Sequence, residues 1–486
     1  MDLRNPDLLR DKAYINGKWV NALDGKSFQV KNPYDNSIIG NVPDMSAGDT
    51  KLAITAAEKA QKTWSSYTSG ERASILKRWH ELLLLHVKDL AFILTAEQGK
   101  PIQEAIGEIR YGAAFVEWFA EEARRIYGDV IPSHSKDKRL ITLKQPIGVV
   151  AAITPWNFPN AMITRKIAPA LAAGCTVVIK PAEDTPLSAL AIGVLAEQAG
   201  FPQGTINIIT TNDPAPVGNE LTANPIVRKL SFTGSTKVGK LLMSQCGNTV
   251  KKVSLELGGN APFIVFKDAD IDAAVSGAIA AKFRNTGQTC VCANRFYVQE
   301  DIYTAFSEKM TEAIKQQKIG SGFLETTQIG PLINDAAVNK VERLVNDALL
   351  KGAATKIGGS RMDLGSGNFY APTVLTNLTP EMTINHEEIF GPVAPIFSFK
   401  TEEEAVALAN NTNYGLAAYF YGRDYAMIWR VAEALEYGMV GINTGRLSTP
   451  LAPFGGIKES GIGREGSKYG IDEYLEIKYL CFGGIE

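Results

Sequence analysis

The sequence has few of the residues that hold small secreted or metal-binding proteins together. Among its 486 residues there are five cysteines and four histidines. The cysteine number is odd and the spacing is irregular, which excludes a secreted disulfide framework. No histidine lies at zinc-ligand spacing from a cysteine pair, so we expect no metal site.

Long apolar runs and blocks of one charge are also missing. No segment reaches the ~18 uninterrupted apolar residues of a membrane span. Residues 1–7 contain acidic residues and an early proline, unlike a signal or transit peptide. The formal net charge of −2 argues against nucleic acid as the main partner. We therefore expect no membrane or nucleic-acid partner and a cytoplasmic location.

The chain does have regular alternation of short apolar runs and helical segments. Asn16-Gly17 predicts a turn after a first strand, and residues 46–127 have the composition and spacing of amphipathic packing helices. Further strands are expected at 148–154, 176–180, 206–210 and 227–233, with helices between them. This order predicts parallel β-α-β units in a sheet covered on both faces. Ligands of such sheets bind at the carboxyl ends of the strands.

A second stretch of the same kind follows. Strands at 261–266 and 295–300 alternate with helices at about 270–284 and 302–316. The pattern predicts a second α/β domain over 258–440. No repeat or low-complexity linker separates the two domains, so we expect them to pack closely.

Three side chains outside the expected cores could carry chemistry. Cys290 ends a polar loop in which Gly287 allows close approach of the backbone to a ligand, and a thiolate is a strong nucleophile toward carbonyl carbon. Glu256 ends an apolar strand, either as a solvated strand end or as a partly buried general base. Asn157 follows another strand, where its amide is either a turn former or an oxyanion donor. Buried cysteines are usually inert, so none of these assignments stands on one residue.

A phosphate and ribose site is the fourth candidate. Lys180 ends a strand, Glu183 follows three residues later, and Gly234 and Ser235 open a helix. The free backbone N–H groups of a helix N-terminus attract a pyrophosphate. The spacing differs from the common G-x-G-x-x-G fingerprint, so the glycines alone are a weak indication.

Seven segments together resemble the aldehyde dehydrogenase superfamily, and they cover nearly the whole chain in the family's order. They are WNFP (156–159), KPAEDTP (180–186), FTGS (232–235), LELGG (255–259), GQTC (287–290), EEIFGPV (387–393) and FGG (454–456). The resemblance implies that Cys290 attacks an aldehyde, that Asn157 and the Cys290 N–H hold the oxyanion, and that Glu256 activates water to hydrolyse the thioester. Because relatives that transfer the acyl group to coenzyme A usually lack this glutamate, Glu256 favours the non-acylating class.

The resemblance also implies the cofactor site and the domain plan. The cofactor-binding residues would be Pro155, Trp156, Lys180, Glu183, Gly234, Ser235, Leu257, Glu388 and Phe390. A carboxylate at Glu183 can bind the ribose 2′-OH and repels a 2′-phosphate, so NAD is expected, with NADP possible because Lys180 is close. The expected plan is a Rossmann-like NAD(P)-binding domain (1–132 and 147–257), a catalytic domain (258–440), a small β oligomerisation arm (133–146 and 472–486) and a return segment (441–471). The expected assembly is a homodimer or homotetramer.

Within the family, the segments around Arg165 and Arg284 are most similar to succinate-semialdehyde dehydrogenases. The two arginines could grip a distal carboxylate, since the guanidinium fork binds carboxylates bidentately, and Ser448 could add a contact. Glutarate semialdehyde is a close competitor because one methylene changes discrimination by only ~1–3 kcal/mol. The residues also leave open a dehydrogenase for neutral aldehydes, in which the arginines are structural, and a non-catalytic scaffold with this fold.

Cys292 lies two residues after Cys290. A disulfide between them would be strained and readily reduced. Some members of the subgroup use such a pair as a redox switch, but Cys292 could equally be a loop thiol with no role.

Overall fold

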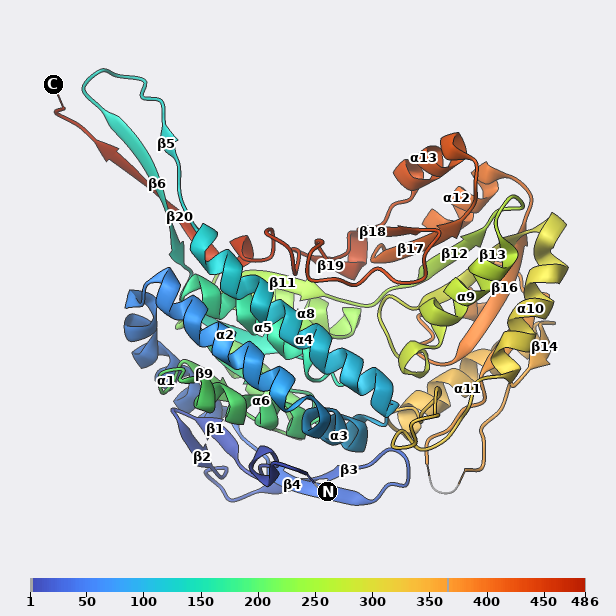
Figure 1. The fold of residues 1–486 in the computed structure, drawn as a ribbon, viewed down its shortest axis with the longest axis horizontal. Helices are drawn as coiled ribbons and strands as arrows, with labels where there is room; N and C mark the ends of the chain where they lie inside the picture. Colours follow the sequence, from blue (N-terminus) through green and yellow to red (C-terminus); the bar gives the residue numbers. More distant parts are fainter. Residues whose placement is uncertain (1–2, 365–366, 486) are drawn as a thin grey trace.

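The computed structural model describes residues 3–364 and 367–485. Residues 1–2 and 486, which fall within the predicted N-terminal region and arm, lie outside the described residues. The described chain forms two α/β lobes and a projecting β-arm (Figure 1). None of its described helices is long and apolar enough to cross a membrane.

The first lobe is built on an eight-stranded sheet with the order β19-β11-β10-β7-β8-β9-β1-β2. Its five central strands are parallel, as the alternating pattern predicted. They are β7 (Val149–Ile153), β8 (Thr176–Lys180), β9 (Ile206–Ile208), β10 (Val227–Thr233) and β11 (Lys252–Glu256). Antiparallel strands close both edges: β1 (Ala13–Ile15) with β2 (Lys18–Val20), and β19 (Gly461–Ile462). The predicted turn between β1 and β2 is confirmed, with φ values of 53° at Asn16 and 72° at Gly17.

Helices cover both faces of this sheet because the side chains of each strand alternate between two cores. Val150 and Ala152 of β7 belong to the core under α2 to α6, whereas Val149 and Ala151 belong to the core under α1, α7 and α8. The helices are α1 (Ala47–Ser66), α2 (Ser69–Leu85), α3 (Val87–Gln98), α4 (Ile102–Glu122), α5 (Ala161–Ala173), α6 (Pro186–Ala199), α7 (Pro214–Ala223) and α8 (Thr236–Gly247). The helix α5 is buried along its whole length, because α4 packs over it (Figure 1).

The second lobe has a seven-stranded sheet, with the order β14-β15-β16-β13-β12-β17-β18. All strands are parallel except β14. The strands are β12 (Ala261–Val265), β13 (Ala293–Gln299), β14 (Ala354–Ile357), β15 (Thr373–Thr376), β16 (Val393–Phe399), β17 (Ala417–Tyr421) and β18 (Met439–Ile442). The helices are α9 (Ile271–Lys282), α10 (Tyr303–Lys315), α11 (Asp335–Leu350), α12 (Glu402–Asn410) and α13 (Tyr425–Ala434). From β18 the chain returns to the first sheet, where β19 pairs with β11.

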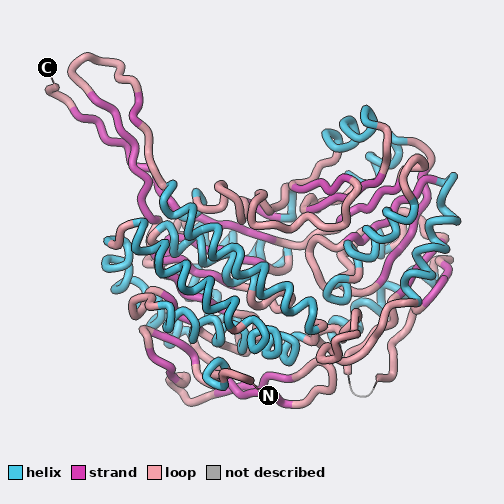
Figure 2. Tube along the Cα trace, viewed as in Figure 1, coloured by secondary structure: helices cyan, strands magenta, loops and turns pink. Residues whose placement is uncertain are grey.

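A three-stranded sheet forms the arm, which projects away from the helices and carries the C-terminal end of the chain (Figures 1 and 2). Its strands are β5 (Val130–Ile131), β6 (Arg139–Pro146) and β20 (Leu475–Phe482). The strands β6 and β20 pair along eight residues each. The arm sheet therefore includes β5, which the predicted range 133–146 leaves out. A separate hairpin of β3 (Ser27–Lys31) and β4 (Ile38–Pro43) lies near the N-terminal end.

Candidate active site

A cavity of about 1000 Å³ is lined by residues of both lobes. From the first lobe come residues that follow β7, β10 and β11, at the carboxyl ends of parallel strands where ligands are expected. Twelve of the residues singled out from the sequence line it: Pro155, Trp156, Asn157, Arg165, Gly234, Ser235, Leu257, Arg284, Cys290, Glu388, Phe390 and Ser448. The remaining four, Lys180, Glu183, Glu256 and Cys292, lie outside its lining.

The loop before Cys290 has a backbone that few sequences could adopt. Asn285, Thr286 and Gly287 are consecutive residues in the left-handed region, with φ of 49°, 57° and 79°. A Cβ on Gly287 would lie 2.2 Å from the carbonyl oxygen of Gly391. The close approach that Gly287 allows in this structure is to the chain before β16, and an approach to a ligand stays a prediction. The loop is thereby fixed against the second lobe.

The Cys290 thiol is half-buried at the cavity wall. Burial raises its pKa to about 12, although the positive charge of Arg165 opposes this shift. The raised pKa favours the protonated thiol over the thiolate. A base must therefore accept the thiol proton before the sulfur can act as a nucleophile.

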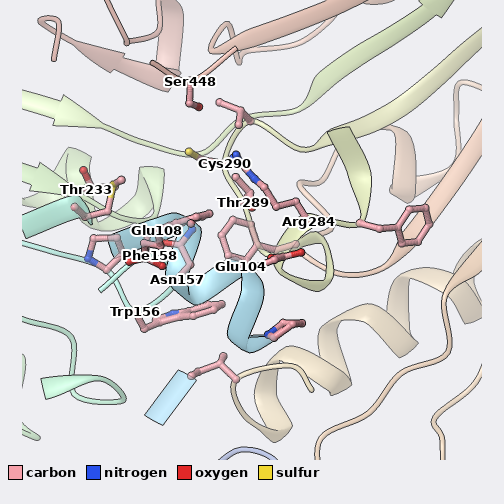
Figure 3. Close-up of a pocket in the computed structure, with 18 of the residues that line it drawn as sticks. Glu104, Glu108, Trp156, Asn157, Phe158, Thr233, Arg284, Thr289, Cys290 and Ser448 are labelled. Carbon is pink, nitrogen blue, oxygen red and sulfur yellow. The ribbon is translucent and has the colours of Figure 1, made fainter. Parts of the chain in front are cut away.

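Asn157 places its amide beside the same loop. Its Nδ2 donates to the carbonyl oxygen of Gln288 at 3.0 Å, which uses one of the two N–H groups of the amide. Its Oδ1 is buried without a partner among the described residues. Figure 3 shows Asn157, Cys290 and Thr289 around one cavity. The geometry matches an oxyanion donor better than a turn former, because the side chain reaches across to the other lobe.

Glu256 is a buried carboxyl group, and the interpretation as a solvated strand end is wrong. Its side chain is 2% exposed, and its Oε2 has no hydrogen-bond partner in the described part of the chain. The strand β19 pairs with β11 at Glu256 and covers it. Burial and the charge of Glu465 raise the pKa of Glu256 well above its usual 4.5. A carboxyl group with a raised pKa is suited to proton transfer near neutral pH.

A buried ion-pair cluster that the sequence did not indicate lies behind Glu256. Glu465 accepts hydrogen bonds from Lys166 Nζ at 2.6 Å and from Arg165 Nε. Burial opposes ionisation of Glu465, but Arg165 and Lys166 outweigh it and lower its pKa to about 2. Almost 300 residues separate the partners, so no local pattern could have linked them.

The two arginines predicted to bind the substrate differ in how many partners their guanidinium groups have. Arg165 is 2% exposed and is engaged by Glu465 through Nε, while its Nη2 has no partner among the described residues and its Cζ lies 4.0 Å from the Phe454 ring centre. Arg284 is half-buried, and within residues 3–364 and 367–485 its guanidinium makes no ion pair. Its Cζ lies 5.3 Å from the ring centre of Phe158. Arg446, for which the sequence pattern indicates no role, also lines the cavity with Ser448 and is exposed.

Residues between β10 and α8 line the part of the cavity in which the sequence predicts the cofactor. Ser235 caps α8 by accepting from Val238 N, and a Cβ on Gly234 would meet the Phe232 ring at 2.5 Å. Thr233 lines the cavity, and its Oγ1 is a buried atom without a hydrogen-bond partner among the described residues. Glu388 Oε1 accepts from Gly259 N at 2.9 Å, which fixes a carboxylate in the cavity wall.

Two further cofactor candidates pair with each other at the end of β8. Lys180 Nζ donates to Glu183 Oε2 at 3.3 Å and to the carbonyl oxygen of Pro181 at 2.9 Å. Lys180 is buried, whereas Glu183 is partly exposed. No group of three metal-binding side chains occurs among the described residues.

Cys292 is buried beneath the loop, and its Sγ lies 3.5 Å from the carbonyl oxygen of Lys282. Both Cys290 and Cys292 are free cysteines. Burial raises the pKa of the Cys292 thiol.

Comparison with known proteins agrees with this geometry. The model of the aldehyde dehydrogenase family matches residues 19–480. The succinate-semialdehyde dehydrogenase (NADP+) of Escherichia coli strain K12 is 58% identical, with 99% of this chain and 100% of the relative covered. The glutarate-semialdehyde dehydrogenase of Pseudomonas aeruginosa is also 58% identical and is covered along 100% of both chains. A crystal structure described as an E. coli NADP-dependent enzyme superposes with a TM-score of 0.98 at 58% identity, covering 99% of this chain and 100% of that chain. The chain belongs to the aldehyde dehydrogenase family.

Proposed function

We propose that this enzyme oxidises succinate semialdehyde to succinate with NAD(P)+ and releases the acid by hydrolysis. The observation that carries the proposal is the guanidinium of Arg284, which lines the cavity of Cys290 without an ion-pair partner among the described residues. The charge of Arg284 also acts on the buried Glu104 in the same cavity wall, but no carboxylate of the described chain occupies the guanidinium fork, which favours a substrate that brings one. The 58% identity to the E. coli enzyme supports the same substrate.

In the proposed mechanism Cys290 gives its proton to solvent, and its thiolate sulfur attacks the aldehyde carbon. The carbonyl electrons move to oxygen, and the oxyanion accepts hydrogen bonds from Asn157 Nδ2 and the Cys290 N–H. Glu388 and Phe390 would hold the nicotinamide, which would supply the hydride acceptor that makes the reaction an oxidation. Glu256 then takes a proton from water, whose oxygen attacks the resulting thioester. The acid leaves and the Cys290 thiol is restored.

Glutarate semialdehyde is the second candidate, because a relative of equal identity carries that name. The two substrates differ by one methylene, worth only ~1–3 kcal/mol in discrimination. Arg446, at the exposed end of the cavity, could contact the longer substrate. In a dehydrogenase for neutral aldehydes Arg284 would serve only its contacts with Glu104 and Phe158.

Replacing Arg284 with alanine tests the carboxylate assignment. We expect kcat/KM for succinate semialdehyde to fall about 100-fold, since losing one partner of a charged hydrogen bond costs about 3 kcal/mol. Butanal has the same chain length and no carboxylate, so its kcat/KM should change less than about threefold. Steady-state NAD(P)H formation with both aldehydes measures this difference. Equal losses for the two aldehydes would contradict the assignment.

For the cofactor we propose that Glu183 favours NAD through the ribose 2′-OH, with NADP also accepted. The paired Lys180 moderates the repulsion of a 2′-phosphate, which agrees with the NADP+ in the name of the E. coli relative. Changing Glu183 to serine should therefore raise the ratio of kcat/KM for NADP over NAD by about tenfold. Steady-state kinetics with each cofactor at saturating aldehyde measures the ratio, and Glu197→Ser, on α6, is a control carboxylate change. An unchanged ratio would show that Glu183 does not discriminate between a 2′-hydroxyl and a 2′-phosphate on the ribose.

We further propose that the arm mediates assembly into a homodimer or homotetramer. Its exposed apolar side chains support this proposal: Val130, Ile131, Leu143, Ile477, Tyr479 and Phe482. Apolar surface on a thin projecting sheet favours a covering partner, and a second copy would satisfy it. The redox switch between Cys290 and Cys292, and the domain boundaries, stay predictions.

A further inference from the structure

The backbone of Asn157 is held by a buried lysine that the mechanism above does not use. Lys100, in the loop before α4, donates from Nζ to the carbonyl oxygen of Asn157 at 2.9 Å. Asn285 Nδ2 donates to the same oxygen, also at 2.9 Å. The peptide group next to the proposed oxyanion donor is thus fixed from both lobes, by Lys100 on one side and the Cys290 loop on the other.

The charge of Lys100 is balanced by a buried carboxylate. Lys100 Nζ lies 2.5 Å from Glu108 Oε2, and both side chains are 0% exposed. The second carboxylate oxygen, Glu108 Oε1, accepts from Asn160 N at 3.0 Å and from Ala161 N at 3.2 Å. These N–H groups begin α5, and a negative charge at a helix N-terminus is favourable. Glu108 therefore anchors the far end of the segment that contains Asn157.

The segment between the two anchors is also held by its aromatic side chain. Lys100 Nζ lies 3.7 Å from the ring centre of Phe158, and Arg284 lies near the same ring. Figure 3 shows Glu108, Asn157 and Phe158 gathered at the cavity. A buried ion pair adds little net stability compared with apolar side chains of similar size. The effect of the Lys100–Glu108 pair lies instead in holding the backbone groups that the two side chains contact.

We propose that Lys100 and Glu108 are positioning residues, which hold the amide of Asn157 where the oxyanion forms. This inference rests on the role proposed above for Asn157. Losing an oxyanion donor costs about 10²- to 10³-fold in rate, and small misplacements of such groups are also costly. Catalysis is therefore sensitive to the Lys100–Asn157 hydrogen bond.

The test uses Lys100→Met, Glu108→Gln and the double variant in the full-length enzyme. The double variant removes both charges of the ion pair and lacks the donor to Asn157 O. Its temperature of unfolding is measured beside wild type, because the buried Glu104 also loses the nearby charge of Lys100. We expect kcat/KM of the double variant to fall about 10- to 100-fold both for aldehyde oxidation and for hydrolysis of p-nitrophenyl acetate. Ester hydrolysis also passes through an oxyanion at Cys290, but it needs no hydride transfer.

Two readouts separate positioning from general damage. Alkylation of Cys290 by iodoacetamide proceeds by displacement at carbon and forms no oxyanion, so its rate should stay within about twofold, as should the Kd for NAD. Lys229→Met is the matched control. Lys229 is a fully buried lysine that donates to Ser254 Oγ at 2.6 Å, and its loss should leave ester hydrolysis within about threefold.

Either of two results would overturn the inference. One is ester hydrolysis by the double variant within about twofold of wild type. The second is a parallel loss of alkylation, cofactor binding and ester hydrolysis, which marks a purely structural pair. Wild-type enzyme that oxidises no aldehyde would refute the proposed function instead, and the ester and alkylation assays would still decide on Lys100 and Glu108.

Discussion

Cys290→Ala is expected to lower aldehyde oxidation by at least about 10⁴-fold, because the covalent route disappears with its nucleophile. The Kd for NAD and the temperature of unfolding should change little, since the loop does not depend on the thiol for its shape. The loop is held instead by the contact of Gly287 with Gly391 and by the hydrogen bonds of Asn285. Steady-state kinetics, cofactor titration and thermal unfolding measure the three quantities.

The matched control is Cys292→Ala, two residues away in the same loop. Its thiol faces the carbonyl oxygen of Lys282 and lies outside the lining of the main cavity, so most activity should remain. Comparable losses in the two variants would show that the loop tolerates no thiol substitution. The assignment of Cys290 as nucleophile would then lose its support.

Glu256→Gln is expected to separate the two halves of the reaction. Attack and oxidation should still give a burst of about one NAD(P)H per active site, whereas steady turnover should fall about 10²- to 10³-fold because water is no longer activated. Rapid mixing followed by steady-state measurement resolves the burst from the turnover. A variant that shows neither burst nor turnover would indicate that Glu256 also deprotonates Cys290, and one with normal turnover would remove Glu256 from the mechanism.

The raised pKa of Glu256 gives this prediction a pH dependence. The protonated carboxyl group cannot accept a proton, so the rate of thioester hydrolysis by wild type should increase as pH rises through the raised pKa of Glu256. This increase of rate with pH should be absent in Glu256→Gln. In the unfolded chain the group ionises near its ordinary pKa, so folding takes up a proton between the two values and wild-type stability falls as pH rises there. The amide variant should therefore gain stability over wild type across the same range.

The sequence predicted much of the fold and the site because their evidence is local. The strands from β7 to β13 and the turn at Asn16-Gly17 follow from short apolar runs and turn residues. Asn157 and Cys290 were found because each stands in a short polar loop beside a predicted strand or helix. The arrangement of strands at the sheet edges was not predicted, since β19 returns to β11 from more than 200 residues away.

The local sequence pattern could not show which charged side chains are buried. Arg165 and Lys166 are adjacent cations in a helix, a pattern typical of a solvated surface, yet α5 is buried on every side. The pattern around Glu256 is typical of an exposed strand end, but the return segment packs over this residue. The roles of Lys100, Glu108 and Glu465 depend on their partners. These partners are distant in sequence or are brought close only by the packing of α4 on α5. Tertiary packing, which no spacing records, decided each of these environments.

The cluster of Arg165, Lys166 and Glu465 constrains how this sequence can change over evolutionary time. Removing one member of a buried charge cluster costs about 3–5 kcal/mol, a large part of the ~5–15 kcal/mol that separates folded from unfolded protein. A lineage that loses Glu465 first would pass through a barely folded ancestor holding two uncompensated cations. Substitutions at the three positions are therefore expected to be fixed together, or after an earlier stabilising substitution. Exposed charged residues nearby can be substituted one at a time.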